Sequence, residues 1–128
     1  HCHVILRGGK SPNYDSESVT ACEEQMVKAG HEANIIIDCS HGNSRKEPRR
    51  QLDVLTSISD QLQAGNRSII GVMLESNLEE GNQPIPDDLA DLRPGVSITD
   101  ACLGWEVTES SLREFAASVR APLKQRRA

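Results

Sequence analysis

Residues 33–41 read Ala-Asn-Ile-Ile-Ile-Asp-Cys-Ser-His, and this stretch is the clearest indication of the fold class. An unbroken aliphatic run that ends on polar groups is typical of a parallel strand buried on both faces. Two further runs have the same form: residues 4–6 end on Arg7, and residues 69–74 end on Glu75. In α/β barrels and doubly wound sheets, active sites lie at the carboxyl ends of such strands. The chain is therefore predicted to carry part of an active site.

Helical patterns follow the strands. Asp15 or Ser16 can cap a helix that ends near Gly30, and apolar residues recur at near-helical spacing from 52 to 62. The third strand opens instead into a long loop, and loops of this length inside compact domains are usually functional. Successive strands start about 30 to 35 residues apart, as in right-handed βαβ units. The pattern predicts an α/β fold with three parallel strand-helix units.

The last helix is predicted to begin near Thr108, which can cap it, and to end before Pro122. Pro122 and the residues after it form a basic tail with Arg126 and Arg127, interpreted as a solvated end. Three strands cannot close a barrel that needs eight. The sequence therefore describes either a small open sheet with two edges or the last part of a barrel.

Composition limits the functions available. The chain has 128 residues, enough for one domain, and its aromatics make up only 2%, so the core must be aliphatic. A formal charge of −5 argues against nucleic-acid binding through bulk positive charge. No apolar stretch approaches the roughly 20 residues that cross a bilayer, so no membrane role is expected and a cytoplasmic location is the default. The four cysteines lack CxxC spacing and are predicted to be reduced thiols.

Three residues form a candidate metal site: His41, Glu75 and Asp100. A mixed nitrogen and oxygen set can hold Mn²⁺, Fe²⁺, Co²⁺ or Zn²⁺. His41 and Glu75 follow neighbouring strand ends, and Asp100 lies in a short apolar stretch after the long loop. The alternative is that His41 is a hydrogen-bonding loop residue and that the two acids are solvated groups or helix caps.

Arg7 is a candidate anion-binding residue. It precedes Gly8-Gly9, whose flexible backbone permits close approach to a phosphate or carboxylate, and Lys10 could add a second charge. The alternative is that Arg7 pairs with a buried acid. The cations at the start of the second helix, Lys46, Arg49 and Arg50, are interpreted as its solvated face.

Two other groups invite a chemical role that the sequence does not favour. In His1-Cys2-His3, alternation along a strand would turn Cys2 away from both histidines, so no three-ligand site follows. Cys39 and Cys102 flank the candidate site, and both are interpreted as packing groups rather than nucleophiles.

Several strings, in order along the chain, closely resemble the class I 3-deoxy-D-arabino-heptulosonate 7-phosphate (DAHP) synthases. The likeness runs from His1 to about Ala121 and is more specific than any single string. The strings are ILRGGK (5–10), PNY (12–14), IDCSHGNS (37–44), GNRSIIGVM (65–73), EGNQ (80–83) and SITDACLGWE (97–106). Small departures fall in loops: Asn77 where the family often has histidine, and Pro94-Gly95 where it usually has Tyr-Gly.

The resemblance implies a (β/α)₈ TIM barrel, of which residues 1–121 would be the last three units and residues 122–128 a tail. It implies a metal-dependent condensation of phosphoenolpyruvate with erythrose 4-phosphate, the first step of the shikimate pathway to the aromatic amino acids. His41, Glu75 and Asp100 match metal ligands of the family, and Arg7 matches a residue that binds the phosphoenolpyruvate phosphate. His41 is also the candidate catalytic residue.

The mechanism that the resemblance suggests is Lewis-acid catalysis, in which the metal polarises the aldehyde while C3 of phosphoenolpyruvate attacks. Water then adds at C2 and phosphate leaves. The family's GPCS string, with its cysteine ligand, and its KPRT loop would lie upstream of His1. The chain is therefore expected to be part of a longer protein, to be inactive alone, and to derive from a homo-oligomeric enzyme.

Two other hypotheses stay open. One is a separately encoded, noncatalytic module that binds metal or phosphate and completes another chain's barrel through its sheet edges. The other is a related phosphoenolpyruvate-dependent aldol synthase that takes a different sugar phosphate.

Overall fold

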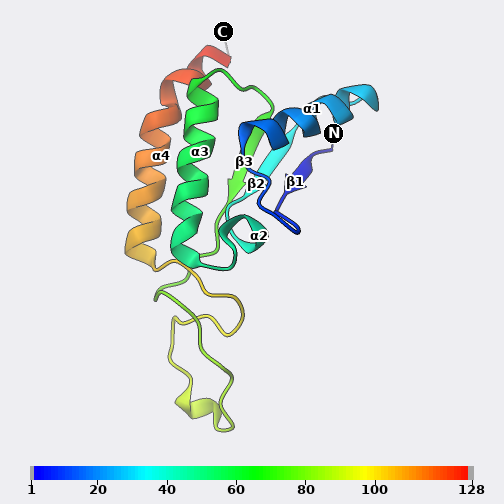
Figure 1. The fold of residues 1–128 in the computed structure, drawn as a ribbon. Helices are drawn as coiled ribbons and strands as arrows, with labels where there is room; N and C mark the ends of the chain where they lie inside the picture. Colours follow the sequence, from blue (N-terminus) through cyan, green and yellow to red (C-terminus); the bar gives the residue numbers. More distant parts are fainter. Residues whose placement is uncertain (1, 127–128) are drawn as a thin grey trace.

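The computed structural model describes residues 2–126 and has one three-stranded parallel sheet (Figure 1). The strands are β1 (Val4–Leu6), β2 (Ile35–Asp38) and β3 (Ile69–Met73), in the order β1-β2-β3. Strand β2 pairs with both neighbours, and its register with β3 shifts between Ile35 and Ile36. The predicted α/β class with three parallel strands is confirmed.

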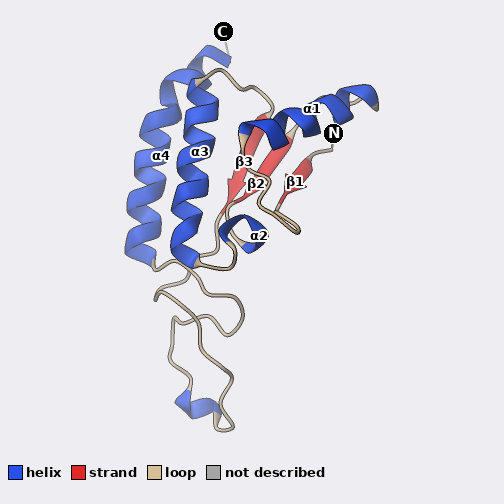
Figure 2. Cartoon of the chain, viewed as in Figure 1, coloured by secondary structure: helices blue, strands red, loops and turns tan. Residues whose placement is uncertain are grey.

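Both connections between successive strands contain helices, as the periodicity predicts (Figure 2). Helix α1 (Ser16–Lys28) follows β1, and the Asp15 carboxylate caps it by accepting the Ser18 backbone N–H at 2.8 Å. This contact lowers the pKa of Asp15. Helix α3 (Gln51–Gln63) follows β2 after two short helical turns, α2 (His41–Ser44) and η1 (Pro48–Arg50).

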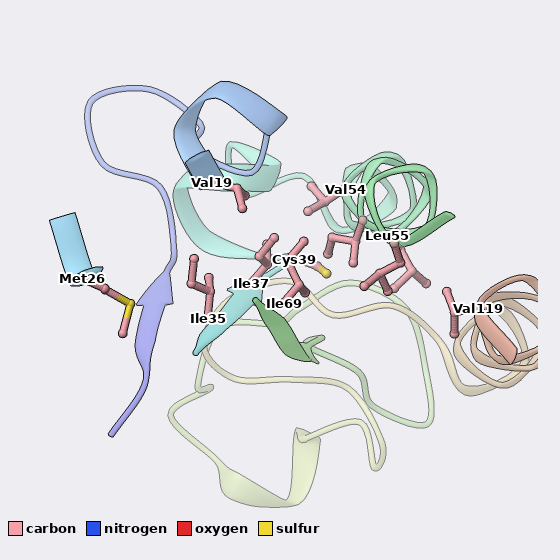
Figure 3. Close-up of a cluster of buried hydrophobic side chains, with 11 residues drawn as sticks. Val19, Met26, Ile35, Ile37, Cys39, Val54, Leu55, Ile69 and Val119 are labelled. Atoms are coloured by element: carbon pink, nitrogen blue, oxygen red, sulfur yellow. The ribbon is translucent and has the colours of Figure 1, made fainter. Parts of the chain in front are cut away.

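The core lies between one face of the sheet and the helices (Figure 3). Ile35 and Ile37 of β2 are fully buried against Val19 of α1 and against Val54 of α3. Helix α4 (Trp105–Arg126) packs beside α3 rather than on the sheet, and Val119 joins the core from there. The core is aliphatic, as the composition predicts, since Leu, Ile and Val supply most of its buried side chains.

The opposite face of the sheet is largely uncovered within residues 2–126. Ile5 of β1 and Ile70 of β3 are each 53% exposed, although the aliphatic runs predict burial on both faces. The prediction is wrong for these two side chains, because α1 and α3 supply the core on the other face only.

Residues 74–104 form an arm that extends away from the sheet and helices (Figure 1). Its two limbs are joined by isolated bridges, Gly81 to Cys102 and Asn82 to Ser97. The buried Gln83 side chain donates to the carbonyls of Arg93 and Val96. A short turn, η2 (Leu89–Asp91), lies near the tip.

The predicted bounds of the last helix are wrong at both ends. Helix α4 begins at Trp105, and the Thr108 hydroxyl donates to the Gly104 carbonyl from within the first turn instead of capping it. The helix also continues through Pro122. Arg126 is not a solvated end, because its guanidinium donates to the carbonyls of Asn66 and Ile69 and ties the last turn to the start of β3. Arg127 lies outside the described residues.

Other expectations concern the thiols and membranes. All four cysteines are free, as predicted. Burial raises the pKa of the Cys39 thiol to about 12, so Cys39 is a protonated packing group rather than a nucleophile. Among residues 2–126, no helix combines the length and the apolar composition that crossing a membrane requires.

Candidate functional site

The three candidate ligands converge beyond the carboxyl ends of the strands. His41 begins α2 directly after β2, Glu75 follows β3, and Asp100 is brought back to the sheet by the returning limb of the arm. One ligand atom from each side chain lies within 4.8 Å of the others. The structure thus brings together the residues that the sequence places 25 to 59 positions apart.

His41 and Glu75 face each other within this cluster. The His41 Nε2 atom lies 3.6 Å from Glu75 Oε1. Their remaining polar atoms are held from outside: His41 Nδ1 lies 2.8 Å from Asp38 Oδ2, and the Ser40 hydroxyl donates to Glu75 Oε2 at 2.6 Å. His41 has φ of +47°, a conformation that non-glycine residues adopt rarely and that is often found at functional sites.

The backbone of Glu75 is held by a buried side chain. Gln51, which opens α3 and has no exposed surface, accepts the Glu75 N–H at 2.8 Å and donates to the Glu75 carbonyl at 3.1 Å. An amide that bonds both backbone groups of one residue acts like a neighbouring strand. Glu75 is therefore positioned from helix α3 as well as from β3.

A polar pocket of about 850 Å³ opens beside the cluster. His41 and Asp100 lie on its wall, together with four cationic side chains. These cations are Arg7, Lys10, Arg45 and Lys46. An excess of positive groups over a single lining carboxylate suits an anionic ligand such as a phosphate.

The floor of the pocket depends on two glycines. Gly8 has φ of +76°, and a Cβ placed there would lie 2.5 Å from the backbone carbon of Gly42. The Gly42 N–H donates to the Arg7 carbonyl at 3.1 Å, and the Asn43 amide donates to the carbonyls of Leu6 and Asp38. The loops after β1 and β2 are thus joined directly, which brings Arg7 beside His41.

The donor set fits a divalent transition metal. Two ligands of one ion at about 2.1 Å each lie about 3.0 to 4.2 Å apart, and the 3.6 Å between His41 and Glu75 falls in this range. One imidazole with two carboxylates suits Mn²⁺, Fe²⁺, Co²⁺ or Zn²⁺. The assignment of these residues as ligands stays a prediction, as does the role of Arg7.

The other sequence predictions have mixed outcomes. The Lys46 side chain is 73% exposed, in keeping with a solvated position, and its Nζ atom also lies 3.4 Å from Asp100 Oδ1 at the edge of the candidate site. Arg49 does lie on the surface, where its guanidinium donates two hydrogen bonds to the Glu80 carboxylate, and these raise its pKa. Cys2 and His3 are exposed, and His1 lies outside the described residues. The Cys102 thiol lies 3.6 Å from the Asp100 carbonyl.

Several residues of the site are missed by the sequence reasoning. Asp38 is singled out only as a polar group at a strand end that could do chemistry, without a specific role, and Ser40, Arg45 and Gln51 are given no role. A signal for Asp38 was present, because a carboxylate three residues before a histidine across a sharp turn can reach its ring. Gln51 carried no such signal, because an amide at the start of a helix is usually solvated.

The fold and site define an α/β protein with a candidate metal cluster and an anion pocket at the carboxyl ends of parallel strands. Residues 1–113 match the family described as DAHP synthetase I. The chain belongs to this family.

Relatives agree with this assignment. The Tyr-sensitive phospho-2-dehydro-3-deoxyheptonate aldolase of Enterobacter agglomerans is 52% identical over 97% of this chain and 58% of that protein. The Tyr-sensitive enzyme of Escherichia coli is 49% identical over 97% of this chain, and the Phe-sensitive one is 48% identical over 94%. The match covers 35% and 34% of these two proteins, so the chain spans about a third of their length.

A solved structure has the same fold. Phospho-2-dehydro-3-deoxyheptonate aldolase from Francisella tularensis superposes with a TM-score of 0.87 and 42% identity. The match covers 94% of this chain and 35% of that one.

Proposed function

We propose that the chain supplies the metal cluster and part of the phosphate pocket of a DAHP synthase, which condenses phosphoenolpyruvate with erythrose 4-phosphate. The observation that carries this proposal is the meeting of His41, Glu75 and Asp100 beside four cations, in a chain that belongs to the family. A ligand cluster for a divalent cation next to an anion pocket suits two phosphorylated substrates.

In this proposal the chain's own residues bind and orient the substrates. Arg7 holds the phosphate of phosphoenolpyruvate, and we assign Lys10 and Arg45, which line the same pocket, to binding anionic groups of the substrates. His41 is the candidate catalytic residue, because its Nε2 atom faces the cluster while Asp38 holds its Nδ1 atom. A bound divalent cation would supply Lewis-acid polarisation of the aldehyde oxygen.

The barrel architecture is part of the proposal. In a (β/α)₈ barrel one sheet face is covered by helices and the other lines the interior. Here α1 and α3 cover one face, while Ile5 and Ile70 on the other are half exposed, as interior residues of an incomplete barrel would be. We assign residues 1–121 to the last three units, with residues 122–128 as a terminal extension. We also propose that the parent enzyme is cytoplasmic and forms a homo-oligomer.

A second candidate function is a noncatalytic module that binds metal or phosphate and assembles with another chain. The incomplete sheet favours it: within the described residues, β1 and β3 each pair on one side only. Open parallel edges of this kind are rarely left without a partner.

A paired assay on the 128-residue chain tests the proposal: Mn²⁺ binding by calorimetry, and phosphate release from the two substrates. We expect binding without turnover, because most substrate contacts would come from outside this chain. Glu75→Gln should abolish binding, whereas Glu79→Gln, a matched change at an exposed glutamate of the arm, should not. Absence of Mn²⁺ binding by the folded chain would overturn the metal site, and turnover would overturn the claim that the chain is inactive alone.

A further inference from the structure

His41 and Glu75 each have two side-chain atoms that could bind a metal. In each residue one of these atoms points into the cluster, and the other is hydrogen-bonded to a neighbouring side chain. For His41 the inward atom is Nε2, since Nδ1 lies 2.8 Å from Asp38 Oδ2. For Glu75 the inward atom is Oε1, since Oε2 accepts the Ser40 hydroxyl at 2.6 Å. Both holding groups come from the same short segment, because Asp38 ends β2 and Ser40 follows two residues later.

Asp38 is itself tightly held. Its side chain is 4% exposed, and its second oxygen, Oδ1, accepts the Ser40 backbone N–H at 2.8 Å. A carboxylate offers only acceptor oxygens, so the Nδ1 atom that faces Oδ2 must carry the hydrogen. In the neutral ring a hydrogen on Nδ1 leaves a lone pair on Nε2, and this is the form in which imidazole binds a metal.

We infer that Asp38 is a positioning residue that holds His41 in the tautomer with hydrogen on Nδ1, so that Nε2 faces the cluster ready to bind a cation. Ser40 has the corresponding role for Glu75, because it fixes which carboxylate oxygen points inward. The inference deepens the proposed function, on whose metal site it rests.

The geometry makes Asp38→Asn a sharp test. The Ser40 N–H requires an acceptor, so the amide oxygen of an asparagine must take the place of Oδ1. The amide NH₂ group then faces His41 Nδ1 and donates to it. His41 would move its hydrogen to Nε2, which faces Glu75, and would no longer present a lone pair there.

The tautomer can be read in the metal-free chain by long-range ¹H–¹⁵N correlation spectra, which distinguish protonated and bare ring nitrogens. In spectra recorded at a pH where the ring carries a single hydrogen, wild type should show it on Nδ1 of His41, and Asp38→Asn should show it on Nε2. Zn²⁺ affinity measured by calorimetry should fall by about 10- to 100-fold in Asp38→Asn. Hydrogen on Nε2 in the wild type, or equal Zn²⁺ affinity in a folded Asp38→Asn chain, would overturn the inference.

Ser40→Ala supplies the second arm, with Ser59→Ala as its matched control. Ser59 is also buried, and its hydroxyl bonds Ser118 between α3 and α4, away from the cluster. Ser40→Ala should weaken Zn²⁺ binding at least several-fold with the His41 tautomer unchanged, while Ser59→Ala should leave affinity unchanged. Equal losses in both variants would mean that Ser40 has only a structural role.

The two proposals fail in different ways. If the wild-type chain binds no Zn²⁺, the metal site is wrong, yet the tautomer of His41 still decides the role of Asp38. If Asp38→Asn does not fold, the wild-type tautomer and the Ser40→Ala comparison decide it.

Discussion

The two ends of the sheet carry polar clusters of different design. At the amino end of β3, Asn66 and Ser68 both donate to Glu23 of α1, and the Asn66 oxygen accepts the N–H groups of Ser68 and Ile69. Arg126 of α4 donates to nearby carbonyls. At the carboxyl end, the side chains of the candidate ligands His41 and Glu75 each have one polar atom held by a neighbour and turn the other polar atom toward each other.

This difference suggests that the amino-end cluster contributes to stability and the carboxyl-end cluster to ligand binding. At the amino end the polar groups bond backbone groups and one another. Such a cluster fastens helices to the sheet, and few of its polar atoms are available to a ligand. A cluster held from outside keeps inward ligand atoms, and parallel α/β folds place their active sites at this end. Changes at the amino end should therefore alter folding, and changes at the carboxyl end should alter binding.

The largest effect is expected from His41→Ala. Loss of one of three ligands should weaken Mn²⁺ binding by more than about 100-fold, since even removal of a group that only orients a ligand costs about 10- to 100-fold. Calorimetric titration measures this, with His31→Ala at an exposed loop as the control. Unchanged Mn²⁺ affinity in His41→Ala would contradict the claim that the carboxyl-end cluster binds the metal.

Gly8→Ala should affect both binding and stability, which makes it the exception at the carboxyl end. The new methyl group would lie 2.5 Å from the backbone of Gly42, and Gly8 has φ of +76°. Strain and overpacking together should lower the free energy of unfolding by about 2 to 4 kcal/mol. Urea denaturation measures the loss, and binding of inorganic phosphate should weaken with it.

Gly9→Ala is the matched control for that change. A Cβ at Gly9 would meet nothing within 4 Å, so stability should change by less than about 0.5 kcal/mol. Similar losses at both glycines would show that the loops after β1 and β2 do not meet as described.

Asn66→Ala tests the amino end. It removes the acceptor for two backbone N–H groups and a donor to Glu23, and should lower the free energy of unfolding by about 1 to 3 kcal/mol. The Mn²⁺ affinity of the folded chain should stay at the wild-type value. A loss of affinity without a loss of stability would reverse the assignment of the two ends.

The smallest effect concerns the thiols. Burial raises the pKa of Cys39 from 9.0 to about 12, whereas Cys2 is exposed. Iodoacetamide at neutral pH should therefore label Cys2 and leave Cys39 unmodified until the chain unfolds, as mass spectrometry of digests can show. A raised pKa in the folded state also means that this contribution to stability is complete below about pH 9 and is lost as the pH rises toward 12.

The sequence predicts local features of this molecule well, but it predicts contacts between distant parts of the chain poorly. Aliphatic runs located all three strands, and an Asp at residue 15 located the start of α1, because burial and capping act over a few residues. The continuation of α4 through Pro122 was missed, and so was the contact from Arg126 to β3 at the end of this helix, because no local pattern records a contact between residues 57 positions apart.

The candidate site shows the same division. Position after strand ends was enough to select His41 and Glu75, but the groups that hold them were not predicted. Ser40 and Gln51 reach Glu75 from 35 and 24 positions away, so their roles exist only once the strands are paired. The resemblance to the family pointed to the same ligands from its motifs, independently of these contacts.

The most direct test of the metal cluster is a crystal of the chain grown with Mn²⁺ and measured near the manganese absorption edge. We expect one anomalous peak bonded to His41 Nε2, Glu75 Oε1 and the Asp100 carboxylate, with Lys46 displaced from Asp100. A manganese ion bound elsewhere, with the cluster empty and Lys46 still beside Asp100, would contradict this expectation.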